Sequence, residues 1–307
     1  MRVNAISGGT AINHLTVGRS MTKIRQVEYS QSGTPTIEGA GVHLKRIFGY
    51  HDVPKFDPFL MLDDFSGEKP DDYKAGFPWH PHRGIETITY MLHGSAEHQD
   101  SLGNKGVIGP GDIQWMTAGS GIIHQEMPKG DPQGRMGGFQ LWANLPARDK
   151  MMDPRYQGIL SDQIPEISPM KGVKVKVIAG QVGDVIGPVK DIVTDPEYLD
   201  VSMERDITFD HIVKNRHTVF AYVFEGECSF GDRGPFGKGN VVLFGEGNLV
   251  LAKTTDRAAR FLLVSGRPLG EPVAWGGPIV MNTDDQLEDA FKELRAGTFI
   301  KAGRTED

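Results

Sequence analysis

The sequence is organised around two short segments, WHPHRGIE at residues 79–86 and WMTAGSGIIHQEMP at residues 115–128. Each segment holds two side chains that can bind a metal, separated by one residue: His80 and His82, then His124 and Glu126. Residues i and i+2 of a β-strand point to the same face, so each pair projects both side chains in one direction. Pro81 favours an extended backbone at the first pair, because it fixes its own φ angle and biases the preceding residue away from helix.

The segment between the two pairs also has the character of β structure. Residues 86–92 read as a strand, and glycine-containing turns follow at residues 103–104 and 109–112. If the two pairs meet across one sheet or barrel, their four side chains converge on a single point, which predicts a metal site. One His-x-His pair is a weak signal, because structural histidines fall at that spacing by chance. Two such pairs on β-type segments are a far more specific signal.

Four longer motifs resemble the pirin family of the cupin superfamily: HPHRGIET (80–87), GDIQWMTAG (111–119), HQEMP (124–128) and QLWANLP (140–146). The resemblance extends from about residue 37 to about residue 282. It implies an all-β bicupin fold, with two stacked double-stranded β-helix (jelly-roll) barrels and a short C-terminal helix. It also implies that Glu126 is the metal carboxylate. The general cupin motif would place that carboxylate at Glu86, and the sequence leaves this alternative open.

The rest of the sequence agrees with two β-rich units. The 39 glycines and 19 prolines suit short strands joined by turns and argue against a helical bundle. We predict an N-terminal cupin barrel with the metal site at residues 22–145, a linker or crossover at 146–172, and a C-terminal cupin-like barrel at 173–300 that includes the helix. Residues 90–94 and 222–226 occupy similar places in the two units.

The second unit contains neither His-x-His nor His-x-Glu, and His211 and His217 offer no ligand geometry. We therefore expect the metal in the first unit alone. The terminal helix is predicted from the capping box TDDQ at residues 283–286, the apolar face that follows it, and the stop signal Gly297.

Three polar residues outside the main motifs have two possible roles each. Asp63 and Asp64 end an apolar strand, and we interpret them as turn caps, with a pocket-lining role as the alternative. We interpret His98 as a solvent-facing residue, with a place near the pocket as the alternative. Cys228 is interpreted as a small packed residue of a strand.

Composition excludes several classes of function. The net charge of −7 argues against direct nucleic-acid binding, which needs clustered Lys and Arg. No run approaches the ~18 apolar residues of a membrane span. A single cysteine forms no intrachain disulfide, which is typical of a reducing compartment and predicts a cytoplasmic protein. The first twenty residues lack the apolar core of a signal peptide and read as a flexible extension, and Met21 is an alternative start to Met1.

Three imidazoles and one carboxylate, without a thiolate, are typical of non-haem iron rather than of structural zinc. We predict Fe(II), although the same ligands would also bind Zn, Ni, Mn, Co or Cu. Four protein ligands leave two octahedral positions for a substrate with adjacent oxygens and for O₂. The resemblance implies a quercetin 2,3-dioxygenase-type reaction on a flavonol, with Glu126 as ligand and catalytic proton acceptor. The alternatives are a pirin-type regulator that acts through protein partners, and another metalloenzyme for hydrolysis or isomerisation.

Overall fold

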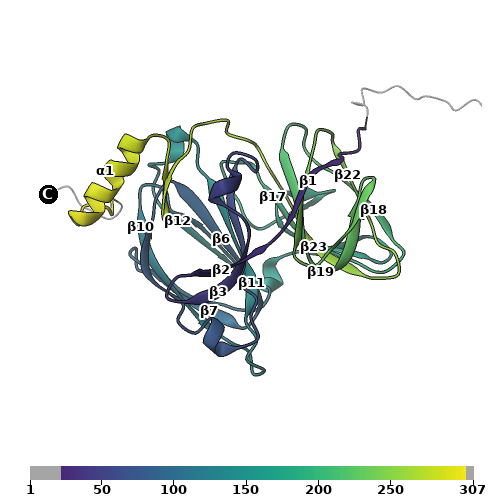
Figure 1. Cartoon of the computed structure of the whole chain (residues 1–307), viewed down its shortest axis with the longest axis horizontal. Helices are drawn as coiled ribbons and strands as arrows, with labels where there is room; N and C mark the ends of the chain where they lie inside the picture. The colour runs from purple at the N-terminus through teal and green to yellow at the C-terminus, as the bar shows by residue number, and fades with distance from the viewer. Residues whose placement is uncertain (1–21, 302–307) are drawn as a thin grey trace, which may run out of the picture.

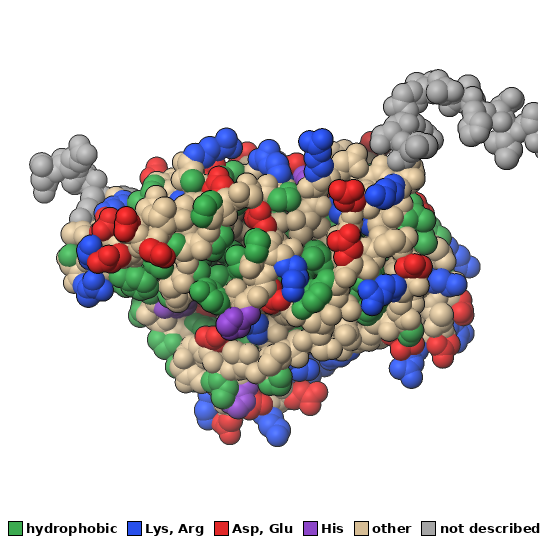
Figure 2. All heavy atoms as spheres, turned by 45° about the horizontal axis from the view of Figure 1, so that its top comes forward, with side chains coloured by type: hydrophobic (Ala, Val, Ile, Leu, Met, Phe, Trp, Pro, Cys, Tyr) green, Lys and Arg blue, Asp and Glu red, His purple; other side chains and the backbone are tan. Residues whose placement is uncertain are grey.

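The computed structural model describes residues 22–301 and consists of two β-sheet units side by side, with one α-helix at the outer end of the first (Figure 1). The predicted extension at residues 1–20 and the alternative start at Met21 lie outside the described residues. Within residues 22–301, no helix is long and apolar enough to cross a membrane. On the face drawn in Figure 2, basic and acidic side chains alternate instead of gathering by sign.

The first unit is a sandwich of two open antiparallel sheets. Its strands are β2 (Thr34–Glu38), β3 (Val42–Phe48), β4 (Phe59–Asp64), β5 (Phe77–His82), β6 (Ile85–His93), β7 (Ser95–Asp100), β8 (Lys105–Ile108), β9 (Ile113–Thr117), β10 (Ile122–Lys129), β11 (Gly137–Asn144) and β12 (Arg155–Ile159). The larger sheet has the order β12-β9-β6-β11-β4-β3-β2, and the smaller has β5-β10-β7-β8. Val42 and Met91 of the larger sheet belong to the same buried cluster as Ala96 and Ile108 of the smaller one.

The second unit is built on a ten-stranded sheet. Its strands are β1 (Val27–Ser32), β13 (Glu166–Met170), β14 (Val173–Ala179), β17 (Glu197–Met203), β18 (Thr208–Ile212), β19 (Thr218–Phe230), β20 (Arg233–Gly237), β21 (Asn240–Phe244), β22 (Leu249–Lys253) and β23 (Ala259–Gly266). The main path is β1-β21-β19-β23-β17-β14-β13, with β18, β20 and β22 joined off it. In β14, the alternation VKVKVIA places Val173, Val175 and Val177 in the core, as a period-2 pattern predicts.

The remaining elements are short. They are the two-stranded ribbons β15 (Gln181–Val182) with β16 (Val185–Ile186) and β24 (Ala274–Gly276) with β25 (Ile279–Met281), four 3₁₀ turns (Tyr50–Asp52, Pro70–Asp72, Ala147–Asp149 and Ser161–Gln163) and α1 (Asp284–Arg295). The all-β prediction is confirmed. The two stacked β units and the short C-terminal helix are also as predicted, and among the described residues the strands pair in open sheets without closing into a continuous barrel.

The two units share a core and a pair of reciprocal hydrogen bonds. The Phe220 ring lies 5.3 Å from the rings of both Phe48 and Phe59. The Tyr90 hydroxyl of the first unit donates to Asp200 of the second at 2.6 Å. The Tyr222 hydroxyl of the second unit donates to Asp64 of the first, also at 2.6 Å. The similarity between residues 90–94 and 222–226 thus corresponds to equivalent positions in the interface between the units.

Each end of the chain packs on the unit that is distant in sequence. Strand β1 lies at the N-terminus but pairs with β21 of the second unit, with Val27 opposite Phe244. The β24–β25 ribbon and α1 follow the second unit but pack on the first, where Ile279 forms a parallel bridge with Arg83. Strand pairing of this kind, across the molecule, leaves no local pattern in the sequence. The boundaries at residues 145 and 173 stay a prediction.

The segment at residues 146–172, predicted as a linker or crossover, contains two strands. β12 pairs with β9 at the edge of the seven-stranded sheet, and β13 pairs with β14 at the edge of the ten-stranded sheet. Edge strands tolerate proline because one of their sides has no strand to bond. Pro169 in β13 is such a residue, and it hid the strand from pattern reading.

The terminal helix has the predicted limits. The Thr283 side chain accepts a hydrogen bond from the backbone of Gln286, and the capping box is complete. Gly297 has a φ of 68°, the left-handed conformation that ends many helices. Cys228 is buried in β19, as its interpretation as a packed residue requires.

The Tyr222–Asp64 bond yields a test of the interface between the units. Replacing Tyr222 by Phe removes the hydroxyl and leaves a buried Asp64 oxygen without its donor, so we expect a loss of about 1–3 kcal/mol in the free energy of unfolding. Urea unfolding followed by fluorescence measures it. Tyr50, which is 60% exposed, gives the matched control, since Tyr50→Phe should change the stability by less than about 0.5 kcal/mol. Equal stabilities of the two variants would contradict the role of this bond.

Candidate metal centre

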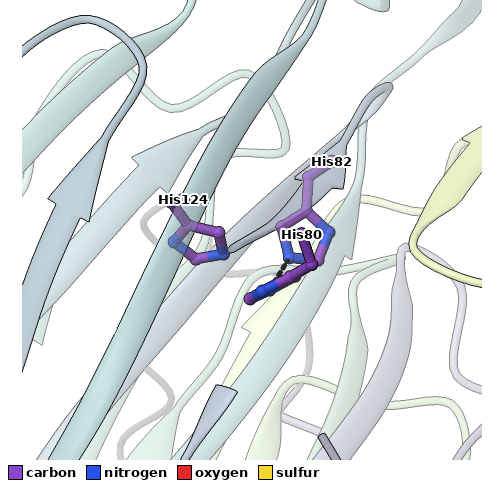
Figure 3. A group of neighbouring side chains, drawn as sticks. All are labelled: His80, His82 and His124. Atoms are coloured by element: carbon purple, nitrogen blue, oxygen red, sulfur yellow. Dashed lines mark hydrogen bonds between the residues drawn. The ribbon is translucent and has the colours of Figure 1, made fainter. Parts of the chain in front are cut away.

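Three histidines meet where β5 and β10 pair, as Figure 3 shows. His80 lies directly opposite His124 in the strand register, and His82 follows two residues later on the same face. One ring nitrogen from each histidine lies within 4.8 Å of the other two. The sequence prediction that the two pairs converge therefore holds for these three side chains.

The edge position of β5 explains how its sequence forms a strand. β5 is the first strand of the smaller sheet and bonds only to β10, so Pro78 and Pro81 can be accommodated despite lacking a backbone donor. The register between β5 and β10 shifts between His124 and Glu126, because Glu126 lies opposite Phe77. This bulge places one extra residue in β5 opposite the pair on β10, which the sequence did not predict.

The histidine tautomers are fixed by backbone carbonyls. The Nδ1 atom of His80 lies 2.8 Å from the Pro78 oxygen, and that of His82 lies 3.0 Å from the Pro278 oxygen. A carbonyl only accepts, so each Nδ1 carries the hydrogen and each neutral ring has its lone pair on Nε2. These two Nε2 atoms lie only 3.1 Å apart. Two lone pairs at this distance repel each other, and a cation shared between them removes the repulsion.

His124 gives a second, independent indication of a metal. Its side chain is fully buried, and within the described part of the chain neither of its ring nitrogens has a hydrogen-bond partner. Buried polar atoms almost always have a partner, and one without needs an explanation. A metal ion bound by one nitrogen supplies it, so the three residues fit a divalent metal.

Burial also keeps the cluster neutral. It lowers the pKa of His82 to about 3, with the charge of His80 as a further cause. Burial likewise lowers the pKa of His124 well below its usual value and that of His80 to a smaller degree. Neutral imidazoles are the form that binds metals, so at neutral pH the cluster requires no deprotonation before it binds one.

Glu126 lies on the same strand as His124 and borders the same cavity as His80 and His82. Its Oε1 accepts a hydrogen bond from the Thr89 hydroxyl at 3.2 Å, and burial raises its pKa to about 7. The cluster of ligand atoms found among residues 22–301 consists of the histidines and does not include Glu126. Coordination by Glu126 therefore stays a prediction.

Glu86, the alternative carboxylate, lies on β6 of the larger sheet. It is fully buried and accepts a hydrogen bond from the Thr117 hydroxyl at 2.7 Å. Burial raises its pKa. In the described structure Glu86 is part of neither the histidine cluster nor the wall of the adjoining cavity. The geometry thus favours Glu126, which borders the cavity with His80 and His82, over Glu86.

The interpretation of His98 as solvent-facing is wrong. His98 is buried, with Nδ1 3.2 Å from the Gln114 amide and Nε2 3.3 Å from Asp100. Its ring centroid lies 5.4 Å from that of His124. The alternation of β7 turns His98 to the inner face, and pairing with β10 places it opposite Glu126. Four polar residues in a row gave no apolar pattern from which to recognise this inner face.

A cavity of about 700 Å³ opens beside the cluster. Its wall contains His80 and His82 and the aromatic side chains of Tyr50, Phe77, Trp79, Trp142 and Trp275. Trp142 joins the histidines to the aromatic wall, with ring centroids 5.1 Å from His82 and 5.8 Å from Trp275. Trp142 lies within a motif seen in the sequence, whereas nothing in the sequence marked Trp275, which comes from the distant β24.

Another part of the cavity wall is charged. Arg46 donates two hydrogen bonds to Asp63, at 3.0 Å and 2.8 Å, and forms an ion pair with Glu38 at 2.9 Å. Burial raises the pKa of Asp63 to about 6, against the opposing effect of Arg46. Asp63 therefore has the pocket-lining role that was the alternative to a turn cap. Asp64 instead accepts hydrogen bonds from Tyr222 and from the backbone of Ser66.

Comparisons with known proteins place both units in one family. The family model described as pirin matches residues 41–143, and the model of the pirin C-terminal cupin domain matches residues 198–300. A pirin-like protein of Caulobacter vibrioides is 46% identical over 278 residues, which are 90% of this chain and 99% of the relative. Pirin-1 of Arabidopsis thaliana is 42% identical and covers 84% of this chain and 88% of its own. A crystal structure of quercetin 2,3-dioxygenase from Acinetobacter baumannii is 30% identical, with a TM-score of 0.83 over 90% of this chain and 99% of that one.

We predict that each histidine of the cluster contributes to metal affinity. Replacing His80, His82 or His124 by Ala removes a ligand, so we expect the dissociation constant for Ni(II) to rise at least about tenfold. Titration calorimetry on protein stripped of metal measures it. Glu86→Ala is the matched control and should bind Ni(II) like the wild type, whereas Glu126→Ala should bind more weakly. Retained binding in Glu126→Ala together with loss in Glu86→Ala would identify Glu86 as the carboxylate ligand.

The lowered pKa of His82 predicts how the stability of the metal-free protein depends on pH. In the unfolded chain this pKa is about 6.5. At lower pH the unfolded state binds a proton that folded His82 does not, so stability is lost as the pH falls. Between about pH 7.5 and about pH 5.5 the wild type should lose about 1.4 kcal/mol more than His82→Gln. Chemical unfolding at both pH values measures the difference, and equal losses in the two proteins would contradict the low pKa.

Proposed function

The chain belongs to the pirin family, and we propose that it is a metal-dependent dioxygenase that opens the central ring of a flavonol with O₂. One observation carries this proposal: a neutral histidine cluster with unsatisfied nitrogens borders a cavity lined by aromatic side chains. The relative from Acinetobacter baumannii that bears the name quercetin 2,3-dioxygenase supports the choice of reaction.

We assign the metal to His80, His82, His124 and Glu126, with Fe(II) as the ion. When bound, the metal acidifies and orients a substrate hydroxyl and brings O₂ into reaction with it. The chain holds the donor nitrogens in place through the bonds from His80 and His82 to the carbonyls of Pro78 and Pro278. These bonds leave the histidine lone pairs directed at one another, and therefore at the position where the ion binds.

The cavity suits a planar aromatic substrate. Its volume of about 700 Å³ lies within the ~300–1,000 Å³ typical of sites for small molecules. The indoles of Trp142 and Trp275 present extended apolar surfaces next to His82. Substrate rings can pack on these surfaces, while Asp63 and Glu38, which also border the cavity, provide acceptors for phenolic hydroxyl groups.

Glu126 is placed to accept the proton of the substrate hydroxyl. Without a bound metal, burial raises its pKa to about 7, so its carboxylate is a stronger base than that of an exposed glutamate. The hydrogen bond from Thr89 occupies Oε1, so Oε2 is the oxygen that we assign to the proton.

Replacing Glu126 by Gln separates ligation from proton transfer. Gln keeps the size and an oxygen donor but loses the charge and most of the basicity. At matched Fe(II) occupancy the variant should bind quercetin yet consume O₂ at least about a hundredfold more slowly, because general-base catalysis contributes ~10²–10⁴-fold. Oxygen uptake measures the rate, and metal analysis verifies the occupancy.

Two outcomes would change the assignment. If Glu126→Gln at matched Fe(II) occupancy turns over quercetin at nearly the wild-type rate, Glu126 does not accept the proton and can act only as a metal ligand. If the wild type loaded with Fe(II) consumes no O₂ with quercetin, the dioxygenase proposal fails, and regulation through a protein partner becomes the leading function.

A further inference from the structure

The segment from β24 to Phe299, here called the C-terminal strap, lies against the metal-binding strand although it follows the second unit in sequence. Trp275, Gly277 and Pro278 of the strap form part of the cavity wall beside His80 and His82. The cavity of the first unit is therefore completed by residues from the far end of the chain.

The backbone of the strap contacts the segment just after the first histidine pair. The Pro278 carbonyl accepts the hydrogen bond from Nδ1 of His82 at 3.0 Å, and the Val280 amide donates to the Arg83 carbonyl at 3.1 Å. A Cβ atom added to Gly84 would lie 2.0 Å from the Val280 oxygen. Only glycine permits this approach at position 84, so the strap fits tightly against the strand that holds His82.

Arg83 connects the two histidine-bearing strands and the strap. Its buried guanidinium donates from Nε to the Ser120 carbonyl and from Nη2 to the Phe299 carbonyl, both at 2.8 Å. Nη2 also forms an ion pair with Glu293 of α1 at 2.8 Å. Ser120 lies in the turn that leads into β10 and hence to His124. The Arg83 side chain thus links the end of β5, the turn before β10 and the strap.

Lys150 provides a second connection at the same place. Its buried ammonium group donates to the Gly84 carbonyl at 2.8 Å, the Val280 carbonyl at 2.9 Å and the Asn144 side chain at 2.6 Å. Lys150 therefore binds three separate segments. Gly84 lies in the loop after β5, Val280 lies in the strap, and Asn144 is at the end of β11. Loss of the strap would leave this buried amine without one of its acceptors, which disfavours undocking.

We propose that docking of the C-terminal strap and metal binding at the histidine cluster stabilise each other, with Arg83 as the positioning residue. With the strap docked, the Pro278 carbonyl holds the hydrogen of His82 on Nδ1 and directs Nε2 at the metal. With the strap displaced, His82 loses that acceptor, and its ring is free to change tautomer and orientation. The coupling between two such events is reciprocal, so the metal must strengthen strap docking by the factor by which the strap strengthens metal affinity.

This inference rests on the proposed metal binding, and its test uses Ni(II) alone as the probe. Glu293→Ala removes the ion pair with Arg83 from a surface helix and should weaken Ni(II) binding about fivefold or more in titration calorimetry. Glu288→Ala, on the same helix, removes an exposed ion pair with Lys292 and should leave the affinity unchanged. Lys301→Ala removes the other ion-pair partner of Glu293 and should also leave it unchanged.

A second measurement needs no variant. Amide hydrogen exchange of residues 284–299 in the wild type should slow by about fivefold or more when Ni(II) is added. Unchanged exchange in the strap of a protein that binds Ni(II), or equal affinities for Glu293→Ala and Glu288→Ala, would overturn the inference. Absence of Ni(II) binding to the wild type is a separate result, because it would refute the metal centre itself.

Discussion

The hydrogen bond from His82 to the Pro278 carbonyl is the contact on which the rest of the structure depends. It joins the histidine cluster of the first unit to the C-terminal strap. Its partners are 196 residues apart in sequence, so it exists only when the end of the chain has returned to the first unit. A similar exchange occurs at the other end. Buried Arg25 donates to the carbonyls of Gly245 and Gly247 in the second unit, as Arg83 donates to those of Ser120 and Phe299 in the first. Each unit is thereby completed by a segment that is distant in sequence, and the hydrogen bonds of a buried arginine hold that segment in place.

The two units share an architecture but use the equivalent strands differently. β18 pairs with β22 in the second unit as β5 pairs with β10 in the first. The inward positions of β18 and β22 hold Phe209, His211, Val250 and Ala252. His211 lies 2.8 Å from Glu197 and so has a partner within its own unit. In the second unit, mainly apolar side chains therefore occupy the positions that the clustered histidines hold in the first unit.

Local patterns in the sequence were sufficient for much of the site. The i, i+2 spacing correctly placed His80 with His82, and capping chemistry located α1. Several of the failures involve pairing over long distances. Trp275 and Pro278 reach the cavity only through the crossing of the chain end, and no nearby residue records that contact. His98 failed for a related reason, since a polar strand shows which face is buried only when its partner strand is known. The carboxylate remains the open part of the ligand set, because a bulge in β5 separates Glu126 from the simple register.

The histidine cluster lowers the stability of the fold that contains it. A buried polar group without a partner costs about 1–3 kcal/mol, and His124 buries two such nitrogens. Two further lone pairs face each other between His80 and His82. Without a metal, this arrangement persists only because its surroundings hold it. The hydrogen bonds of the Arg83 guanidinium and of the Lys150 amine, both buried next to the cluster, connect those surroundings to it. Both residues also hold the C-terminal strap, and the same contacts therefore keep the site in shape for a metal and close the cavity in which the substrate would bind.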